Sequence, residues 1–204
     1  ALALAGTMTL SLAACGGSKA DTTTADTPAE TTETTDTADA ASTDGQTYTV
    51  GICQLVQHEA LDAATQGFKD AIVEALGEDN VTFEEQNASG DSATCATIIN
   101  QLVSDNVDLI LANATPALQA AAQGTDTIPV LGTAVTEYGV ALDIDNFDGL
   151  VGTNVSGTSD LAPLDQQAAM LNELFPDAKY GGLLYCSAEA NSQYQVDTVQ
   201  AALE

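Results

Sequence analysis

The 204 residues carry thirty acidic side chains against three lysines and no arginine, so the formal net charge at pH 7 is −27. Nucleic-acid binding needs clustered cations that neutralise phosphate, and the chain has none, which excludes nucleic acids and argues against any polyanionic partner. The acidity otherwise indicates a solvated surface that repels copies of itself.

The chain opens on a segment of small and apolar residues that ends at a cysteine. ALALAGTMTLSLAA is too short to span a bilayer, which takes about 20 residues, and it matches the apolar region of a secretory signal. LAAC, which ends at Cys15, resembles the bacterial lipobox, in which the cysteine becomes the lipidated first residue of the mature protein. We therefore expect residues 1–15 to be a partial lipoprotein signal peptide.

The next segment, residues 16–46, is rich in Thr, Asp, Glu and Ala and has no large apolar residue. It cannot bury enough surface to offset the entropy of ordering, so we expect a disordered acidic tether that reaches roughly 30 Å. Two or more acyl chains on Cys15 would hold the protein stably at a membrane. The expected location is extracytoplasmic, anchored to the cell membrane.

From residue 47 the sequence alternates between short apolar stretches and segments with helical spacing of apolar residues. The expected strands are residues 48–55, 80–87, 107–113, 128–135, 149–155 and 180–186. The expected helices are residues 59–77, with Gly77 as C-cap, and residues 91–106, 115–124, 162–175 and 189–204. Such alternation predicts an α/β fold with doubly wound parallel sheets. No strand follows the last helix, so we expect the second half of a two-part architecture to be missing.

The cysteines after the tether are Cys53, Cys95 and Cys186. None forms a CxxC pair, and the single His58 lies near only Cys53, so we expect no metal site. Cys53 falls within a strand pattern and Cys95 on an apolar helical stripe, which favours buried free thiols. A Cys53–Cys95 disulfide is the alternative in an exported protein, because the sequence does not give the geometry.

In doubly wound sheets, ligands bind beyond the carboxyl ends of the strands. Thr115 followed by Pro116 is typical of an N-cap with proline at the first helical position, and the helix end so formed suits a carboxylate. Thr158 and Ser159 can donate to a carboxylate, and Asp160 can accept from an ammonium group. Ordinary helix capping would account for the same residues.

Catalysis finds no support in the sequence. The chain has no GxSxG elbow, no GxxxxGK[ST] phosphate loop and no GxGxxG dinucleotide fingerprint. A nucleophilic pair would have to join Cys53, inside a strand pattern, to His58. We expect neither an enzyme nor a cofactor.

Four segments in order resemble bacterial ABC-transporter substrate-binding proteins of the tryptophan/tyrosine-uptake type. They are VGICQLVQHEALDAATQGFKDAI, NASGDSATCATIINQLVSDNVDLILANATPALQAAAQ with IPVLGTAVTE, NVSGTSDLAP, and LLYCSAEANSQYQV. The resemblance covers residues 48–204 and implies the two-lobed type I periplasmic-binding-protein fold. Residues 47–157 would then form the first lobe, and residues 158–204 the crossover and the start of an incomplete second lobe.

The resemblance also implies a function: capture of a small solute, commonly an aromatic amino acid, between the lobes and delivery to a membrane permease. Ten residues match the positions that this function needs. They are Gln54, His58, Thr115, Thr158, Ser159, Asp160, Ser187, Glu189, Asn191 and Ser192. Our hypothesis is that Thr115, Ser159 and the second-lobe helix start hold the ligand carboxylate. Asp160 or Glu189 would hold its ammonium group.

The chain departs from the family at Gln57 and Glu59, where Glu and Pro are usual, and at Cys186, where Asn is frequent. Because a thiol does not match the hydrogen bonding of an amide, the preferred side chain of the ligand can differ. Two alternatives stay open: a lipid-anchored sensing subunit that signals to a membrane receptor, and a binding protein for a solute other than an amino acid. A transcription regulator would need a basic helix-turn-helix, which the acidic amino-terminal segment does not provide.

Overall fold

The structure is a computed structural model that describes residues 45–204. The expected signal segment with Cys15, and residues 16–44 of the expected tether, lie outside the described residues.

Strands and helices alternate along the first two thirds of the described chain. The strands are β1 (Tyr48–Gln54), β2 (Val81–Asn87), β3 (Leu109–Asn113), β4 (Val130–Val135) and β5 (Val155–Ser159). The helices are α1 (Glu59–Leu76), the short 3₁₀ turn η1 (Glu78–Asn80), α2 (Ser92–Ser104), α3 (Thr115–Gly124), α4 (Tyr138–Leu142), α5 (Leu164–Leu174) and α6 (Ala190–Leu203). Gly77 ends α1 at a φ of 88°, as its expected role of C-cap requires.

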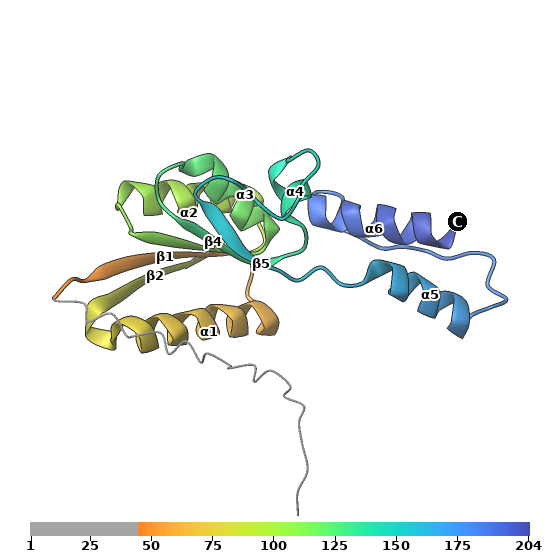
Figure 1. The fold of residues 1–204 in the computed structure, drawn as a ribbon, viewed down its shortest axis with the longest axis horizontal. Coiled ribbons are helices and arrows are strands. Elements are labelled where there is room, and N and C mark those ends of the chain that lie inside the picture. The colour runs from red at the N-terminus through yellow and green to blue at the C-terminus, as the bar shows by residue number, and fades with distance from the viewer. Residues whose placement is uncertain (1–44) are drawn as a thin grey trace, which may run out of the picture. The chain divides into compact units, whose positions relative to one another are not determined.

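The five strands form one parallel sheet in the order β2-β1-β3-β4-β5 (Figure 1). The chain starts at β1, moves outward to β2, and then crosses to β3 and onward in the opposite direction. Helix α1 covers one face of the sheet, and α2 and α3 cover the other. The expected doubly wound α/β fold with a parallel sheet is confirmed.

Residues of β1 alternate between two apolar cores, one on each face of the sheet. Val50 and Ile52 pack on the α1 side, where Phe68 contacts them. Cys53 joins the larger core on the other side. A Cβ at Gly51 would lie 2.8 Å from a methyl carbon of Leu102, so glycine at this position lets α2 approach the sheet closely.

Tyr138 closes the β4–β5 corner of the sheet. Its hydroxyl shares its single proton between the carbonyls of Gly132, at 3.0 Å, and Thr158, at 3.2 Å. Gly157 lies against this hydroxyl and against the Gly132 backbone, where a Cβ would clash. The edge strand β5 is therefore fastened to β4 by a side chain that the sequence did not single out.

The expected strand at residues 149–155 is wrong in position, because β5 begins only at Val155. Gly149 and Gly152 have φ values of 96° and 73°, which interrupt an extended backbone before β5 pairs with β4. Residues 156–159, which the sequence did not assign to a strand, consequently belong to β5. The expected boundary between residues 157 and 158 lies inside β5.

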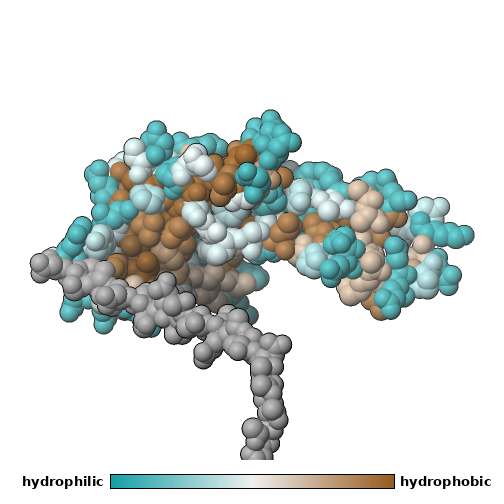
Figure 2. Space-filling view, in the orientation of Figure 1, coloured by the Kyte–Doolittle hydropathy of each residue, from teal (hydrophilic) through white to brown (hydrophobic). Residues whose placement is uncertain are grey.

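The expected strand at residues 180–186 is absent: within residues 45–204, this segment pairs with no other strand. A parallel strand needs a neighbour to receive its backbone hydrogen bonds, and the described sheet ends at β5. Tyr180 is 97% exposed and Leu184 is fully exposed. Figure 2 shows brown and pale brown residues on the surface of the α5–α6 segment.

Among residues 45–204, no helix combines the length and the apolar character that crossing a bilayer takes.

Candidate functional site

The carboxyl ends of the strands form one polar edge, and the order β2-β1-β3-β4-β5 places its switch point between β1 and β3. Ligands of doubly wound sheets bind in the crevice at such a point. Backbone hydrogen bonds join the loops along this edge. They run from Ala88 N to Gln54 O (2.9 Å), Leu55 N to Asn113 O (3.1 Å), Ala114 N to Thr133 O (3.0 Å) and Asp160 N to Val135 O (3.0 Å). Six of the ten expected site residues lie at this edge: Gln54, His58, Thr115, Thr158, Ser159 and Asp160.

Thr115 was expected to be the N-cap of α3, but this expectation is wrong. The N-cap is Ala114, which has a φ of 86° and offers no side-chain acceptor, and Thr115 is the first helical residue. A non-glycine residue at positive φ is uncommon and costs free energy, so the surrounding structure must impose this turn. The turn directs the Thr115 hydroxyl inward, where it is buried and has no hydrogen-bond partner among the described residues.

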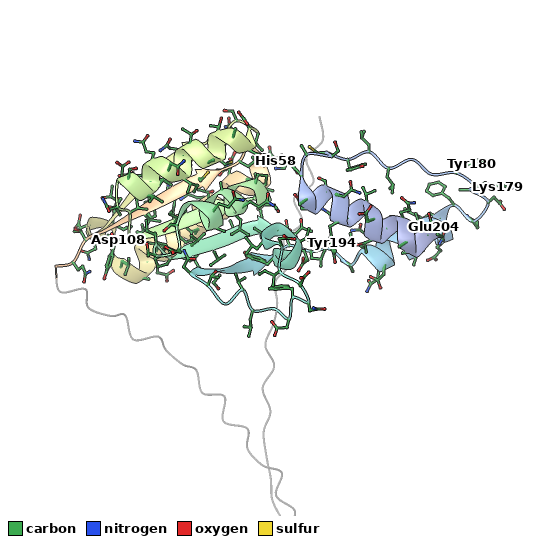
Figure 3. All side chains as sticks on the ribbon, turned by 90° about the horizontal axis from the view of Figure 1, so that it is seen from above. His58, Asp108, Lys179, Tyr180, Tyr194 and Glu204 are labelled. Atoms are coloured by element: carbon green, nitrogen blue, oxygen red, sulfur yellow. The ribbon has the colours of Figure 1, made fainter. Side chains whose placement is uncertain are left out.

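His58 is the N-cap of α1 (Figure 3). Its Nδ1 accepts a hydrogen bond from Ala60 N at 3.2 Å, and its side chain is exposed. The residue therefore has a structural role in the described conformation, which fixes one ring nitrogen as an acceptor and leaves the other free to reach a ligand.

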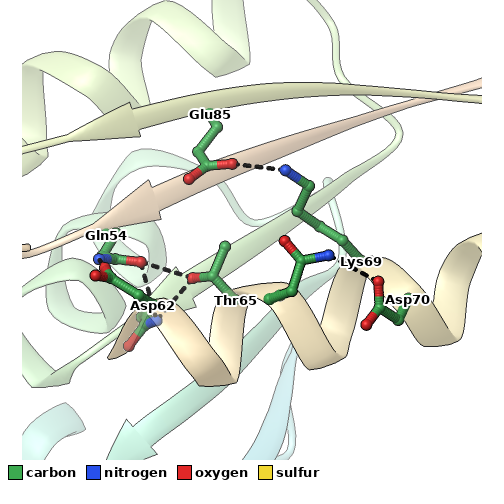
Figure 4. A network of polar contacts seen from close by, with 8 residues as sticks. Gln54, Asp62, Thr65, Lys69, Asp70 and Glu85 are labelled. Atoms are coloured by element: carbon green, nitrogen blue, oxygen red, sulfur yellow. Dashed lines mark hydrogen bonds and ion pairs between the residues drawn. The ribbon is translucent and has the colours of Figure 1, made fainter. Parts of the chain in front are cut away.

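Gln54 is 4% exposed, and its side-chain amide is fully engaged within the domain (Figure 4). Its Nε2 donates to Val56 O at 2.9 Å and to Asp62 Oδ1 at 2.6 Å. Its Oε1 accepts from Thr65 Oγ1 at 2.7 Å. The structure makes Gln54 the centre of a buried network, and its expected contact with the ligand stays a prediction.

Sequence reasoning missed the partners of Gln54. Asn113, at the end of β3, is fully buried and donates through Nδ2 to Thr65 Oγ1 and to Leu61 O, both at 2.9 Å. The sequence does contain a signal for these residues. Each of two buried apolar strands ends in a polar residue, Gln54 or Asn113, and Thr65 interrupts the apolar face of α1. What the sequence did not show is that they meet.

At the end of β5, the Ser159 hydroxyl also has hydrogen-bond partners within the domain. Its hydroxyl donates to Thr136 O at 2.6 Å and accepts from Leu161 N at 3.2 Å. The carboxylate of Asp160 is exposed and has no partner among residues 45–204. Burial, together with the charge of Asp160, raises the pKa of Tyr138 to about 12. An unpaired carboxylate at this edge can accept hydrogen bonds from a ligand cation.

The four remaining expected residues lie around the start of α6. Glu189 is its N-cap position, and Ser192 Oγ donates to Glu189 Oε2 at 3.4 Å. Asn191 Oδ1 is buried and has no partner among the described residues. Ser187 is exposed. The hydrogen bonds of this group stay within the segment, so its part in a shared site remains a prediction.

Cys53 and Cys95 are free thiols that lie against each other in the core. Their hydrogen bond and their burial raise the pKa of the Cys53 thiol far above its ordinary value, which makes it unreactive in the folded state. The structure thus has the free thiols that the sequence favoured and not the alternative disulfide. Within residues 45–204, no three His, Cys, Asp or Glu side chains gather in a way that could hold a metal ion.

A groove of about 690 Å³ lies between α1 and β2, next to the Gln54 network. It contains Lys69, one of two lysines in the described chain, but this lysine is paired with Glu85 at 2.9 Å (Figure 4). The same ammonium group lies 5.5 Å from the ring centroid of Phe83. Because its cation is already neutralised, the groove offers less to a ligand carboxylate than the switch point does.

A parallel doubly wound sheet with a polar switch point is the architecture of α/β domains that bind ligands at the carboxyl ends of their strands. The chain belongs to the family of ABC transporter substrate binding proteins, whose model matches residues 49–204.

Three relatives agree with this assignment. A tyrosine-binding protein of Clostridioides difficile (strain R20291) is 40% identical over 155 residues, which are 74% of this chain and 44% of that protein. A domain of Streptococcus pneumonia solved in complex with L-Trp is 34% identical with a TM-score of 0.71, covering 78% of this chain and 54% of the other. A ligand-free, open substrate binding protein with adhesive properties from Clostridium difficile is 39% identical with a TM-score of 0.59, covering 76% and 52%. The chain thus spans about half the length of the relatives that it matches.

Proposed function

We propose that the whole protein binds an aromatic amino acid, tyrosine or tryptophan, between two lobes and delivers it to an ABC permease in the membrane. The observation that carries the proposal is the buried, unpartnered hydroxyl of Thr115 at the amino end of α3, beside the switch point of the sheet. A buried polar group without a partner costs free energy, and a ligand that supplies the partner recovers it. The names of the two relatives, one tyrosine-binding and one solved with L-Trp, supply the class of ligand.

The ligand carboxylate is assigned to Thr115. The first backbone N–H groups of α3 have no intrahelical partner, and the positive end of the helix dipole lies at the same place. The Thr115 hydroxyl adds a donor there. Ser159 was the second expected donor, but its proton is held by Thr136 O. Its assigned role is to hold the ends of β4 and β5 together.

The ligand ammonium group is assigned to Asp160. Its backbone N–H is bonded to Val135 O at 3.0 Å, which fixes the residue to the end of β4. Its carboxylate is exposed and unpaired among the described residues, whereas Glu189 already accepts from Ser192. Asn191, with its buried unpartnered oxygen, is the assigned contact from the second lobe.

The protein is assigned to the extracytoplasmic side of the membrane, held there by lipidation of Cys15 and by the tether that follows. This assignment rests on the lipobox-like sequence, because these residues lie outside the described part of the chain. Replacement of Cys15 by Ser should release the protein from the membrane fraction and abolish the incorporation of labelled fatty acid. Continued membrane retention would overturn the anchor.

The binding site is tested on the full-length protein with Cys15 replaced by Ser. Ligand at a hundredfold excess over Kd stabilises the folded state by about 2.7 kcal/mol, so tyrosine or tryptophan should raise the midpoint of thermal unfolding while other amino acids do not. Asp160→Ala should weaken binding by at least about a hundredfold, because it leaves the ammonium group without its charged partner. Asp165→Ala, which removes an exposed charge in α5, is the matched control.

Two results would overturn parts of this proposal. Full affinity in Asp160→Ala would end the ammonium assignment. No stabilisation of the wild type by any amino acid would end the aromatic amino acid assignment and leave a binding protein for another solute, with the loop at Cys186 as the first place to look.

A further inference from the structure

Four polar side chains from three separate elements form one hydrogen-bonded chain beneath the amino end of α1 (Figure 4). Asn113 Nδ2 donates to Thr65 Oγ1 at 2.9 Å, and Thr65 Oγ1 donates to Gln54 Oε1 at 2.7 Å. Gln54 Nε2 then donates to Asp62 Oδ1 at 2.6 Å. Thr65, Gln54 and Asn113 are nearly or fully buried, whereas Asp62 is exposed.

The direction of every bond in this chain follows from the number of protons available. The Thr65 hydroxyl has one proton, which it gives to Gln54 Oε1, so it must accept from the Asn113 amide. Gln54 Nε2 faces two acceptors, the Asp62 carboxylate and the Val56 carbonyl. A flipped Gln54 amide would place oxygen against both. The Asp62 carboxylate and the Val56 carbonyl therefore together hold the buried Gln54 amide in this orientation, with Oε1 towards Thr65 and Asn113.

In this orientation the network forms hydrogen bonds to backbone carbonyls on both sides of His58. Gln54 Nε2 holds Val56 O at 2.9 Å, before His58, and Asn113 Nδ2 holds Leu61 O at 2.9 Å, after it. The loop between β1 and α1 is one of the two loops that flank the switch point of the sheet. Its conformation is thus set by hydrogen bonds from Gln54 and Asn113 to its backbone.

Helix α1 is also held to the sheet by apolar contacts outside this network. Phe68 packs into the apolar core on the α1 face of the sheet, and Leu61 packs against the core around Cys53. The packing of α1 on the sheet therefore has sources other than Asp62. Fixing the loop is a separate role for Asp62, and it favours binding because a loop that is already ordered loses less conformational entropy when the ligand binds.

We infer that Asp62 is a positioning residue of the ligand site: acting through Gln54, it pre-organises the loop between β1 and α1. The inference rests on the proposed function, since it concerns binding at the same site. Asp62 is assigned no contact with the ligand.

The test measures the Kd for tyrosine and tryptophan by calorimetry on the full-length protein with Cys15 replaced by Ser. Asp62→Ala should weaken binding by on the order of tenfold, while the unfolding midpoint of the ligand-free protein stays within about 2 °C of wild type. Asp62→Asn keeps an acceptor oxygen and should restore affinity to within about threefold. Asp70→Ala is the matched control, because Asp70 accepts only from Gln66 on the solvent side of the same helix, at 2.7 Å.

A second measurement needs no ligand. In NMR spectra, the side-chain amide protons of Gln54 should exchange slowly with water in the wild type and in Asp70→Ala. One of them should exchange faster in Asp62→Ala. A general loss of stability would speed the exchange of both protons, so faster exchange of one proton alone reports the loss of its bond to Asp62.

The outcomes separate the two proposals. If the wild type binds and Asp62→Ala binds equally well, the positioning role is overturned and the proposed function stands. If Asp62→Ala leaves the Gln54 amide protons slow, the network does not depend on Asp62 and the inference is overturned on that ground. If the wild type binds no aromatic amino acid, the proposed function is overturned and this inference with it.

Discussion

Residues 48–160 and residues 161–204 have similar apolar patterns and very different burial. In the first region, helices cover both faces of a five-stranded sheet, and Leu102 and Ile110 are completely buried. In the second, Leu174 and Phe175 are each 61% exposed, and the segment from Tyr180 to Cys186 pairs with no strand among the described residues. The apolar faces that the periodicity predicts are thus buried in the first region and exposed in the second.

The difference shows that periodicity determines which side of an element is apolar, and not what covers it. Helix α5 has apolar residues at helical spacing, yet only Leu164 and Ala168 of this helix are buried. Burial is a property of the partner surface, which is encoded elsewhere in a chain. In relatives about twice as long, further chain is available to provide such a surface.

The largest expected difference between the two regions is in the rate at which their cysteine thiols react. Cys186 is exposed, whereas Cys53 and Cys95 are buried and hydrogen-bonded to each other. In the 204-residue chain with Cys15 replaced by Ser, a thiol reagent should modify Cys186 at least about a thousandfold faster than the other two, which become accessible only when the core opens.

In denaturant without reductant, all three thiols should react at the same rate. Modification of Cys53 or Cys95 as fast as Cys186 under native conditions would contradict a closed core in the first region. Failure of both to react in denaturant would reveal the disulfide that the sequence left as an alternative.

A pair of leucine truncations measures the same contrast in free energy. Leu102→Ala should lower the free energy of unfolding by about 2–5 kcal/mol, because the fully buried side chain leaves a cavity between α2 and β1. Leu174→Ala should change it by less than about 0.5 kcal/mol. Urea unfolding of the 204-residue chain checks both values.

The same pair in the full-length protein sharpens the comparison. A cost of Leu174→Ala that appears only there would place the missing partner surface outside residues 45–204. Equal costs for the two substitutions in the 204-residue chain would contradict the difference in burial.

The sequence predicts the first region well and the second poorly for the same physical reason. Strands β1, β3 and β4 lie within residues that the apolar pattern assigns to strands, because strands covered on both faces are mostly apolar. The edge strand β2 was predicted from the alternation of Val81 and Phe83 with polar residues. β5 is an edge strand of small and polar residues, so its pattern gives no such signal, and the expected strand fell before it. The expected strand at residues 180–186 has the apolar residues but no neighbour in the described chain.

The candidate site divides in a similar way. That Thr115 lies at the carboxyl edge of the sheet follows from its position after an expected strand, whereas Asp160 follows β5, which the sequence did not place correctly. That Thr115 is not the N-cap depends on the positive φ of Ala114, and the network depends on Thr65 meeting Asn113, 48 residues later. Contacts at such separations are set by the packing of α1 on the sheet and have no local signature.

Tyr138 contacts β5, the last strand before the second region, and its substitution should have the smallest effect on the free energy of unfolding. Its hydroxyl is hydrogen-bonded to Gly132 O in β4 and to Thr158 O in β5, the last strand before the second region. Tyr138→Phe removes both bonds while keeping the ring, and it leaves carbonyls that can accept from water or remain unpaired. We expect a loss of about 1 kcal/mol in the free energy of unfolding below pH 10.

The pH dependence of this loss distinguishes the hydroxyl from the ring. Burial and the nearby Asp160 charge raise the pKa of Tyr138 to about 12 in the folded state, against an ordinary value of 10.0. The folded protein therefore holds this proton between pH 10 and 12 while the unfolded chain releases it, so the stabilisation is complete below pH 10 and is lost as pH rises through 12. The stability of the wild type should fall towards that of Tyr138→Phe across this window in urea titrations. A constant difference between the two proteins up to pH 12 would show that the Tyr138 hydroxyl does not hold β5 in the way that its hydrogen bonds indicate.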